Sequence, residues 1–288
     1  MKCLGQVERC ADITQEKFYN DVFQKQPVVM PGKIAHWRAL QTWNPDFFRS
    51  RYGGVAVWLS RYDPASPRSF LQQNIDYDFR EASFAEYVDQ LSAPNGCYSI
   101  RESIGLLKAN PELLDDLDHF RPFGYSKEPA DDQFMALWFA PKGGVTGLHI
   151  DVGENLLFHL HGHKHVLIFA PDQTRLLYEE DLQQLAEPGL ADRIDADTLE
   201  MWRSYVRWSK VNAFNPDFKR FPRLEGAAYL DAVIAPGDAL YIPCGWWHAV
   251  RSLDITISVS KSLFRDEFLR APDPADPAGR STTWELRP

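Results

Sequence analysis

The sequence lacks several features that would define a specialised class of protein. Its four cysteines form neither the dense set of a disulfide-stapled domain nor the paired spacing of a zinc knuckle. No apolar run approaches the roughly 20 residues that a membrane-spanning helix needs. The first residues also lack the apolar core of a secretion signal. These absences predict a cytoplasmic protein with reduced thiols and no membrane partner.

Positive charge is also in short supply. The 288 residues include 31 lysines and arginines against 40 aspartates and glutamates, which gives a formal net charge of −9. That balance disfavours broad binding to nucleic acids or anionic membranes, although it leaves room for a local basic patch. The rest of the composition is ordinary, with 44% hydrophobic and 25% charged residues. The length suits one large domain or two small ones.

Residues 1–130 are predicted to form helices between short strands, as a flank that packs on the rest of the chain. Asn44-Pro45 places a capping residue and an N1 proline at the start of one helix. Ser83 and Glu86 form a capping box ahead of apolar residues at helical spacing. Asn110-Pro111 predicts the start of a further helix before the pattern changes.

From 131 to 264 the apolar pattern becomes that of short strands. Turn-forming residues such as Gly143-Gly144 and Pro236-Gly237 separate apolar or alternating runs. The eight predicted strands cover residues 133–140, 147–151, 156–161, 165–170, 232–235, 239–242, 247–251 and 255–260. Eight short strands at this density predict a mainly β fold with helical decoration, built as a closed barrel or jelly roll.

Two segments stand apart from the predicted barrel. A long polar insertion at about 172–231 interrupts it, and a helix is expected there from Asp197. Insertions of this length usually form a lid or an interface. Residues 265–288 are rich in proline and predict a loose tail.

The strongest chemical signal is a pair of metal-binding residue types two positions apart. His149 and Asp151 would point to the same face of a strand and can hold one ion together. His248 begins a later strand, which a barrel would bring opposite the first pair. Two imidazoles and one carboxylate that leave the rest of the coordination sphere open are the ligands of non-haem Fe(II) oxygenases. His-x-Asp with a distant histidine is also a common pattern, so the three residues alone leave open ordinary polar roles in the core or on the surface.

The sequence around these residues resembles the JmjC-type 2-oxoglutarate oxygenases. The matching stretches are 146–151, 155–157, 162–169 and 236–243, followed by Trp247-His248. The resemblance extends over 8–264 and is strongest to the small JmjC-only hydroxylases, which include the asparaginyl hydroxylase of hypoxia signalling and the wybutosine hydroxylase. It implies a double-stranded β-helix of the jelly-roll or cupin type. It also implies a catalytic Fe(II) held by His149, Asp151 and His248.

The resemblance further implies a binding site for the co-substrate 2-oxoglutarate. Lys164 would pair with the distal carboxylate, and the hydroxyls of Thr146 and Tyr98 would reach the same group. Asn155 matches a family asparagine close to the metal. Without the resemblance, Lys164 fits a solvated hairpin, Thr146 a turn, Tyr98 the core and Asn155 a turn or cap.

Three positions depart from the family pattern. Ser260 stands where many relatives carry asparagine, Ser262 where an aromatic residue is common, and His159 where glutamine is frequent. We expect these residues near the co-substrate end or the floor of the barrel. There they would alter how 2-oxoglutarate packs without removing a metal ligand.

The resemblance leads to one preferred function and leaves alternatives open. The preferred function is an Fe(II)- and 2-oxoglutarate-dependent dioxygenase that uses O2 to hydroxylate a C–H bond of an amino-acid side chain in a protein or peptide. The carboxylate of Asp151 favours hydroxylation, although N-demethylation begins with the same C–H step. The alternatives are an oxygenase for a modified tRNA nucleoside or a small metabolite, and a non-catalytic cupin-like binding protein. A short helix at 263–270 leaves a homodimer open.

Overall fold

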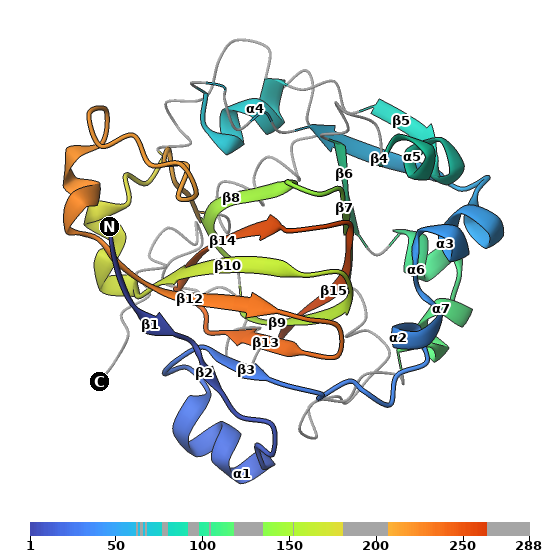
Figure 1. Cartoon of the computed structure of the whole chain (residues 1–288), viewed down its shortest axis with the longest axis horizontal. Helices are drawn as coiled ribbons and strands as arrows, with labels where there is room; N and C mark the ends of the chain where they lie inside the picture. Colours follow the sequence, from blue (N-terminus) through green and yellow to red (C-terminus); the bar gives the residue numbers. More distant parts are fainter. Residues whose placement is uncertain are drawn as a thin grey trace, which may run out of the picture.

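The described residues of the computed structural model are 1–61, 63, 66, 68–76, 80–91, 98–103, 105–117, 135–151, 153–180 and 207–263. Strands cross the centre of the molecule as two facing sheets, and helices lie around them (Figure 1). The strands of the barrel are β7 (Met135–Ala140), β8 (Val145–Ile150), β9 (Glu154–His161), β10 (Lys164–Phe169), β12 (Ala228–Ile234), β13 (Ala239–Ile242), β14 (Trp247–Ser252) and β15 (Thr256–Leu263).

The strand order shows how the chain winds around the barrel. The smaller of the two sheets contains β12–β10–β14–β8 and the larger contains β13–β9–β15–β7. All neighbours within these two groups are antiparallel. Along the chain, successive strands alternate between the sheets except where β12 follows β10. This winding is a double-stranded β-helix, so the expected fold class is confirmed.

The eight expected strands are all present, with ends that differ from the expected ones by up to four residues in the described part of the chain. The strand expected at 232–235 begins at Ala228 instead. Its first half pairs in parallel with β1 (Lys2–Gln6), an edge strand from the far end of the chain. Because this pairing comes from a distant segment, the local apolar pattern of 232–235 contained no sign of it.

Further strands and short helices surround the barrel. The strands are β2 (Glu8–Arg9), β3 (Val28–Met30), β4 (Ala56–Arg61), β5 (Arg80–Ser83), β6 (Tyr98–Ser103) and β11 (Arg207–Trp208). The helices are α1 (Gln15–Lys17) with a π-helical turn at Phe18–Val22, α2 (Ala39–Thr42), α3 (Pro45–Tyr52), α4 (Phe70–Asp76), α5 (Phe84–Gln90), α6 (Gly105–Ala109) and α7 (Glu112–Asp115). Short 3-10 helices cover Pro171–Leu176 and Pro222–Gly226.

The helix starts follow the sequence signals closely. The side chain of Asn44 accepts from the backbone N–H of Phe47 at 2.9 Å, directly ahead of α3. Both halves of the capping box between Ser83 and Glu86 are present at the start of α5. Since a capping contact needs only residues three apart, it can be read from the local sequence.

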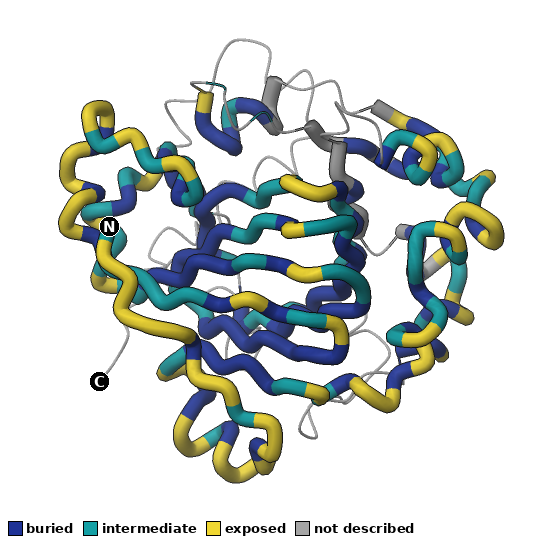
Figure 2. The backbone as a smooth tube through the Cα atoms, viewed as in Figure 1, coloured by how far each residue is buried: buried dark blue, intermediate teal, exposed yellow. Residues whose placement is uncertain are grey.

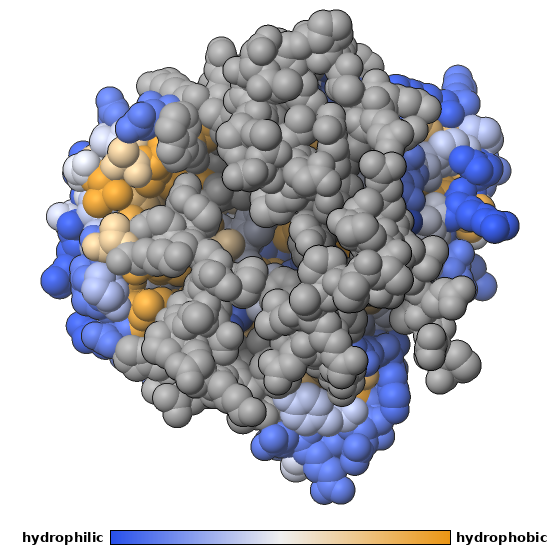
Figure 3. Space-filling view, turned by 180° about the vertical axis from the view of Figure 1, so that it is seen from behind, coloured by the Kyte–Doolittle hydropathy of each residue, from blue (hydrophilic) through white to orange (hydrophobic). Residues whose placement is uncertain are grey.

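The main hydrophobic core lies between the helices and the larger sheet. Figure 2 shows the barrel strands largely buried, while the outer loops are exposed. On the outer side of the larger sheet, Phe48 stacks on Phe84 with ring centroids 5.1 Å apart, and the hydroxyl of Tyr87 donates to the carbonyl of Phe139 at 2.7 Å. Seen from behind, the rim of the molecule is mostly hydrophilic (Figure 3). This packing covers the outer side of the larger sheet and leaves the interior of the barrel for the site.

Some expectations fall on residues outside the described ranges. These are the helix expected from Asp197, the tail at 265–288 and the boundary between flank and barrel near residue 130. Within the described ranges, no helix has the length and apolar character required to cross a bilayer.

Candidate metal centre

The three candidate ligands converge at one end of the smaller sheet. His149 on β8 and His248 on β14 are directly opposite partners in the ladder between these strands. Asp151 follows the last residue of β8, with Oδ1 3.3 Å from Nε2 of His149 and Oδ2 3.3 Å from Nε2 of His248. One potential ligand atom from each residue lies within 4.8 Å of the other two. This separation suits three donors around a single ion.

The other nitrogen of each imidazole is tied to the backbone. Nδ1 of His149 lies 2.8 Å from the carbonyl oxygen of Gly147, and Nδ1 of His248 lies 3.3 Å from that of Trp246. A carbonyl only accepts, so each Nδ1 is the protonated nitrogen. In a neutral imidazole this leaves Nε2 unprotonated, which is the tautomer that a metal ligand requires.

The local backbone explains how the two strands present their ligands together. In the pairing of β14 with β8, His248 faces His149, but Val250 faces Thr146. This shift in register marks a bulge, which re-aims side chains where it interrupts a ladder. Gly147 to Ile150 are buried, so this end of β8 lies inside the barrel wall.

The surroundings put the ligands in metal-binding protonation states. Burial lowers the pKa of His149, and the neighbouring His248 lowers it further. Burial opposes the ionisation of Asp151, but the two imidazoles outweigh it and hold the pKa of that carboxyl well below its usual range. At neutral pH His149 is neutral and Asp151 is ionised, so this part of the site needs no deprotonation before it binds a cation.

Asn155 supports the carboxylate, as its place near the ligands suggested. Its side-chain amide donates to Oδ2 of Asp151. Its own carbonyl oxygen, Oδ1, is buried and has no hydrogen-bond partner. A buried oxygen without a partner beside a cation site is a group that a bound ligand or water can satisfy.

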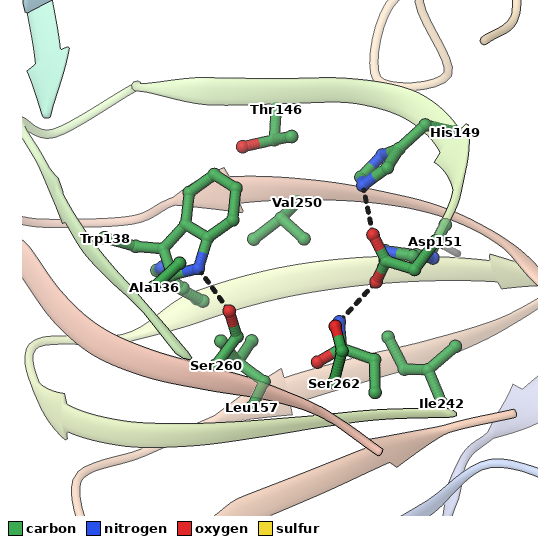
Figure 4. Close-up of a pocket in the computed structure, with 13 residues that line it drawn as sticks. Ala136, Trp138, Thr146, His149, Asp151, Leu157, Ile242, Val250, Ser260 and Ser262 are labelled. Carbon is green, nitrogen blue, oxygen red and sulfur yellow. Dashed lines mark hydrogen bonds and ion pairs between the residues drawn. The ribbon is translucent and has the colours of Figure 1, made fainter. Parts of the chain in front are cut away.

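A cavity of about 160 Å³ opens beside the ligands, between the two sheets (Figure 4). Cavities of about 150 Å³ admit a small organic molecule such as benzene. In Figure 4, His149 and Asp151 lie at one end, and Trp138 and Ala136 lie at the other. The lining residues are Ala136, Trp138, Thr146, His149, Asp151, Asn155, Leu157, Lys164, Ile242, His248, Val250, Ser260 and Ser262.

Lys164 is a buried amine that lines this cavity. The residue is 5% exposed, and burial lowers the pKa of its amine to about 7. No carboxylate of the described residues forms an ion pair with it. A carboxylate brought into the cavity would restore the charge on this amine, because an opposite charge favours the ionised form.

The other expected site residues differ in what the structure shows. Thr146 lines the cavity. Tyr98 begins β6, where its backbone pairs with Arg61, but its side chain lies outside the described part of the chain. Ser260 and Ser262 line the cavity, and Ser260 accepts a 2.7 Å hydrogen bond from the indole of Trp138. His159 is fully buried, with its ring nitrogens on Ser258 and the carbonyl of Gly162.

Trp208 contacts a candidate ligand although the sequence did not predict it as part of the site. Its ring stacks on that of His149, with centroids 4.7 Å apart and planes 19° from parallel. Trp208 belongs to the insertion, where no periodic pattern or motif marks a residue that would contact a metal ligand. By contrast, Val250 could have been predicted to line the cavity, because it lies two positions after His248 on the same strand.

Comparisons with known proteins give consistent matches. A family model described as "Cupin-like domain" matches residues 14–266. "Lysine-specific demethylase 8" of Xenopus tropicalis is 29% identical over 82% of this chain and 47% of its own length. "Bifunctional peptidase and (3S)-lysyl hydroxylase JMJD7" of Homo sapiens is 27% identical over 84% of this chain and 79% of its own. "HSPB1-associated protein 1" of Homo sapiens is 28% identical over 84% of this chain and 49% of its own.

The chain therefore spans about half the length of two of these relatives and most of the third. In all three the match covers more than four-fifths of this chain. The resemblance thus concerns the barrel and its helical flank together.

Proposed function

The chain belongs to the family of cupin-like domains, and on that premise we propose that it is an Fe(II)- and 2-oxoglutarate-dependent dioxygenase that hydroxylates an amino-acid side chain in a protein or peptide. One observation carries the proposal. Two imidazoles and a carboxylate lie within 4.8 Å of one another at the edge of a cavity that also contains a buried lysine.

The donor set fits a ferrous ion. His149, Asp151 and His248 supply two nitrogens and one oxygen, which is the ligand combination of non-haem iron oxygenases. All three come from one wall of the cavity, so the opposite side of an ion among them faces open space. When bound, iron would activate O2, of which one oxygen atom would go to 2-oxoglutarate as it is converted into succinate and CO2, and the other would convert a C–H bond into C–OH.

The chain's own residues position the co-substrate and keep water away. Lys164 provides a positive charge for the distal carboxylate of a dicarboxylic acid, and the hydroxyl of Thr146 can donate to the same group. Leu157, Ile242 and Val250 make much of the remaining wall apolar. Asn155 holds the orientation of Asp151. We assign Tyr98 a third contact to the distal carboxylate on the resemblance alone.

The names of two relatives support an amino-acid side chain as the substrate. One is called a lysyl hydroxylase and another a lysine-specific demethylase. The net charge of −9 agrees with a basic side chain better than with a nucleic acid. Lysine in a peptide is therefore the first substrate to test, with N-demethylation of methyl-lysine as the second candidate.

The test is succinate formation from 2-oxoglutarate under air with Fe(II), in the presence of separate panels of lysine peptides, methyl-lysine peptides and RNA. We expect lysine peptides to stimulate turnover and to gain one oxygen atom by mass spectrometry. Formaldehyde release from methyl-lysine peptides would favour demethylation instead. Stimulation by RNA alone would contradict the proposed substrate class.

Matched variants connect turnover to the site. His149→Ala and Asp151→Ala should abolish succinate formation while the fold is retained. His163→Ala is the control, because His163 pairs with Asp254 on an exposed hairpin outside the site. If the two site variants remained as active as the His163 control, the proposed metal centre would be wrong.

A further inference from the structure

Three aromatic rings from distant parts of the chain form one stack behind the candidate metal ligand. Phe70 on α4 stacks on Trp208 on β11, with centroids 5.0 Å apart and planes 23° from parallel. Trp208 in turn stacks on His149, at 4.7 Å and 19°. The three residues are at most 7% exposed. The ligand therefore rests on a buried aromatic surface.

The backbone holds Trp208 in register with the ligand. Trp208 and His149 are directly opposite partners in the antiparallel pairing of β11 with β8. The N–H of Ser209 also donates to the carbonyl of Leu148 at 2.9 Å. Directly opposite residues on one face of such a pair are in contact range, so the two rings meet because the strands pair.

A second link ties the other end of the stack to the insertion. The hydroxyl of Ser69, next to Phe70, donates to the carboxylate of Glu180 at 2.7 Å. The N–H of Glu180 donates to the carbonyl of Trp208 at 2.7 Å. Both Ser69 and Glu180 are buried. The segment before α4 and the segment that contains Trp208 are thus connected through one residue, Glu180.

The fit of Phe70 against β8 is tight. A Cβ atom added to Gly147 would collide with Cβ of Phe70 and lie 2.6 Å from its Cγ. Glycine at this position therefore allows α4 to approach the strand closely. Because the carbonyl of Gly147 also accepts from Nδ1 of His149, the same short stretch fixes both the hydrogen bond and the stack around the ligand.

These contacts restrict the imidazole in two independent ways. The hydrogen bond at Nδ1 sets which ring nitrogen faces inward, and the indole plane sets the tilt of the ring. We propose that Trp208 is a positioning residue for His149, so that the insertion at 172–231 helps to build the metal centre. The proposal rests on the proposed function in one respect, which is that the triad binds a divalent cation.

The test measures binding of Co(II) to the whole chain without co-substrate or turnover. Trp208→Leu removes the flat ring, and we expect its Kd for Co(II) to rise by about 10- to 100-fold, as for other residues that orient metal ligands. The visible absorption spectrum of bound Co(II) should also change, because that spectrum reports ligand geometry. Trp208→Phe keeps a flat ring and should restore both the affinity and the spectrum to near those of the wild type.

Trp37→Leu is the matched control. Trp37 is as buried as Trp208 but packs on Phe158, outside the residues that line the cavity. This variant should lose stability without a change in Co(II) affinity or spectrum. If Trp208→Leu does not fold, Trp208→Met replaces it, since methionine fills an irregular space without a flat ring.

The outcomes separate this proposal from the proposed function. If Trp208→Leu or Trp208→Met bound Co(II) with the wild-type affinity and spectrum, the positioning role would be wrong. If the affinity fell equally in the Trp37 control, the effect would be one of stability and the role would again be wrong. If the wild type bound Co(II) but never consumed 2-oxoglutarate, the proposed function would fail while the role of Trp208 stood. A wild type that bound no divalent metal would overturn both.

Discussion

If 2-oxoglutarate binds beside Lys164 as proposed, we expect its affinity to depend on pH. Burial lowers the pKa of this amine to about 7 in the free protein. A distal carboxylate bound beside it would raise the pKa again, because an opposite charge favours the ammonium form. Binding of 2-oxoglutarate above pH 7 must then take up a proton at Lys164.

The sign and size of the effect follow from the pKa of Lys164 in the free protein, about 7, and from its higher pKa in the complex. Below pH 7 the amine is already charged, so the affinity for 2-oxoglutarate should be constant there. As the pH rises through 7, the affinity should fall by about tenfold per pH unit, or about 1.4 kcal/mol, until the pH reaches the pKa of the complex. At pH 8 about nine in ten amines start neutral, so binding should take up nearly one proton.

Isothermal titration calorimetry can measure this proton directly. 2-Oxoglutarate is titrated without oxygen into Mn(II)-loaded protein at several pH values between about 6.5 and 9, in two buffers of different ionisation enthalpy. Lys164→Arg is the charged control, since arginine stays protonated, and it should show neither proton uptake nor a pH-dependent Kd in this range. Lys164→Met should bind weakly at every pH.

The reasoning would be refuted by a wild-type affinity that stays constant across this range while Lys164→Met still weakens binding. That combination would mean that Lys164 is charged before the ligand arrives, and therefore that its burial does not control its protonation. Equal binding by the wild type and Lys164→Met would instead remove Lys164 from the co-substrate site.

Further predictions concern stability and neighbouring contacts. Lys164→Met should raise the free energy of unfolding by a few kcal/mol at pH 7, because the amine titrates at about 7 when folded and near 10.5 when unfolded; urea denaturation should show this gain shrinking as the pH approaches 10.5. Asn155→Ala removes the donor to Asp151 and should weaken Mn(II) binding by about 10- to 100-fold, with unchanged affinity as the contrary result. Trp138→Phe loses the hydrogen bond to Ser260. It should weaken 2-oxoglutarate binding by about fivefold and leave Mn(II) affinity intact. A loss of metal binding would contradict the place of Trp138 at the far end of the cavity. Ser83→Ala removes the capping box of α5 and should cost about 1 kcal/mol of unfolding free energy without affecting either ligand.

Lys164 shows how this site conflicts with stability. A buried amine without a paired carboxylate lowers the free energy of unfolding of the free protein. A dicarboxylate ligand would pair with the amine and remove this destabilisation. We therefore expect 2-oxoglutarate to raise the melting temperature of the metal-loaded wild type by more than that of Lys164→Met. Both proteins are measured over the same range of 2-oxoglutarate concentrations.

Local sequence patterns were enough to predict the eight barrel strands and the starts of α3 and α5. Apolar alternation depends only on neighbours along the chain, so the barrel strands could be located, and the caps at Asn44 and Ser83 need residues only three apart. The spacing of His149 and Asp151 likewise predicted two neighbouring ligands, although Asp151 lies one residue beyond the end of β8. The resemblance then suggested which distant histidine and lysine accompany them.

Tertiary structure decided what no local pattern contains. The direct pairing of His149 with His248 depends on which strands meet and in which register. The contact between Trp208 and His149 depends on an insertion that returns to the edge of β8. The low pKa of Lys164 depends on its burial within the folded barrel. Each is a property of surfaces brought together by folding, and so the sequence could name the ligands but not the surroundings that orient and tune them.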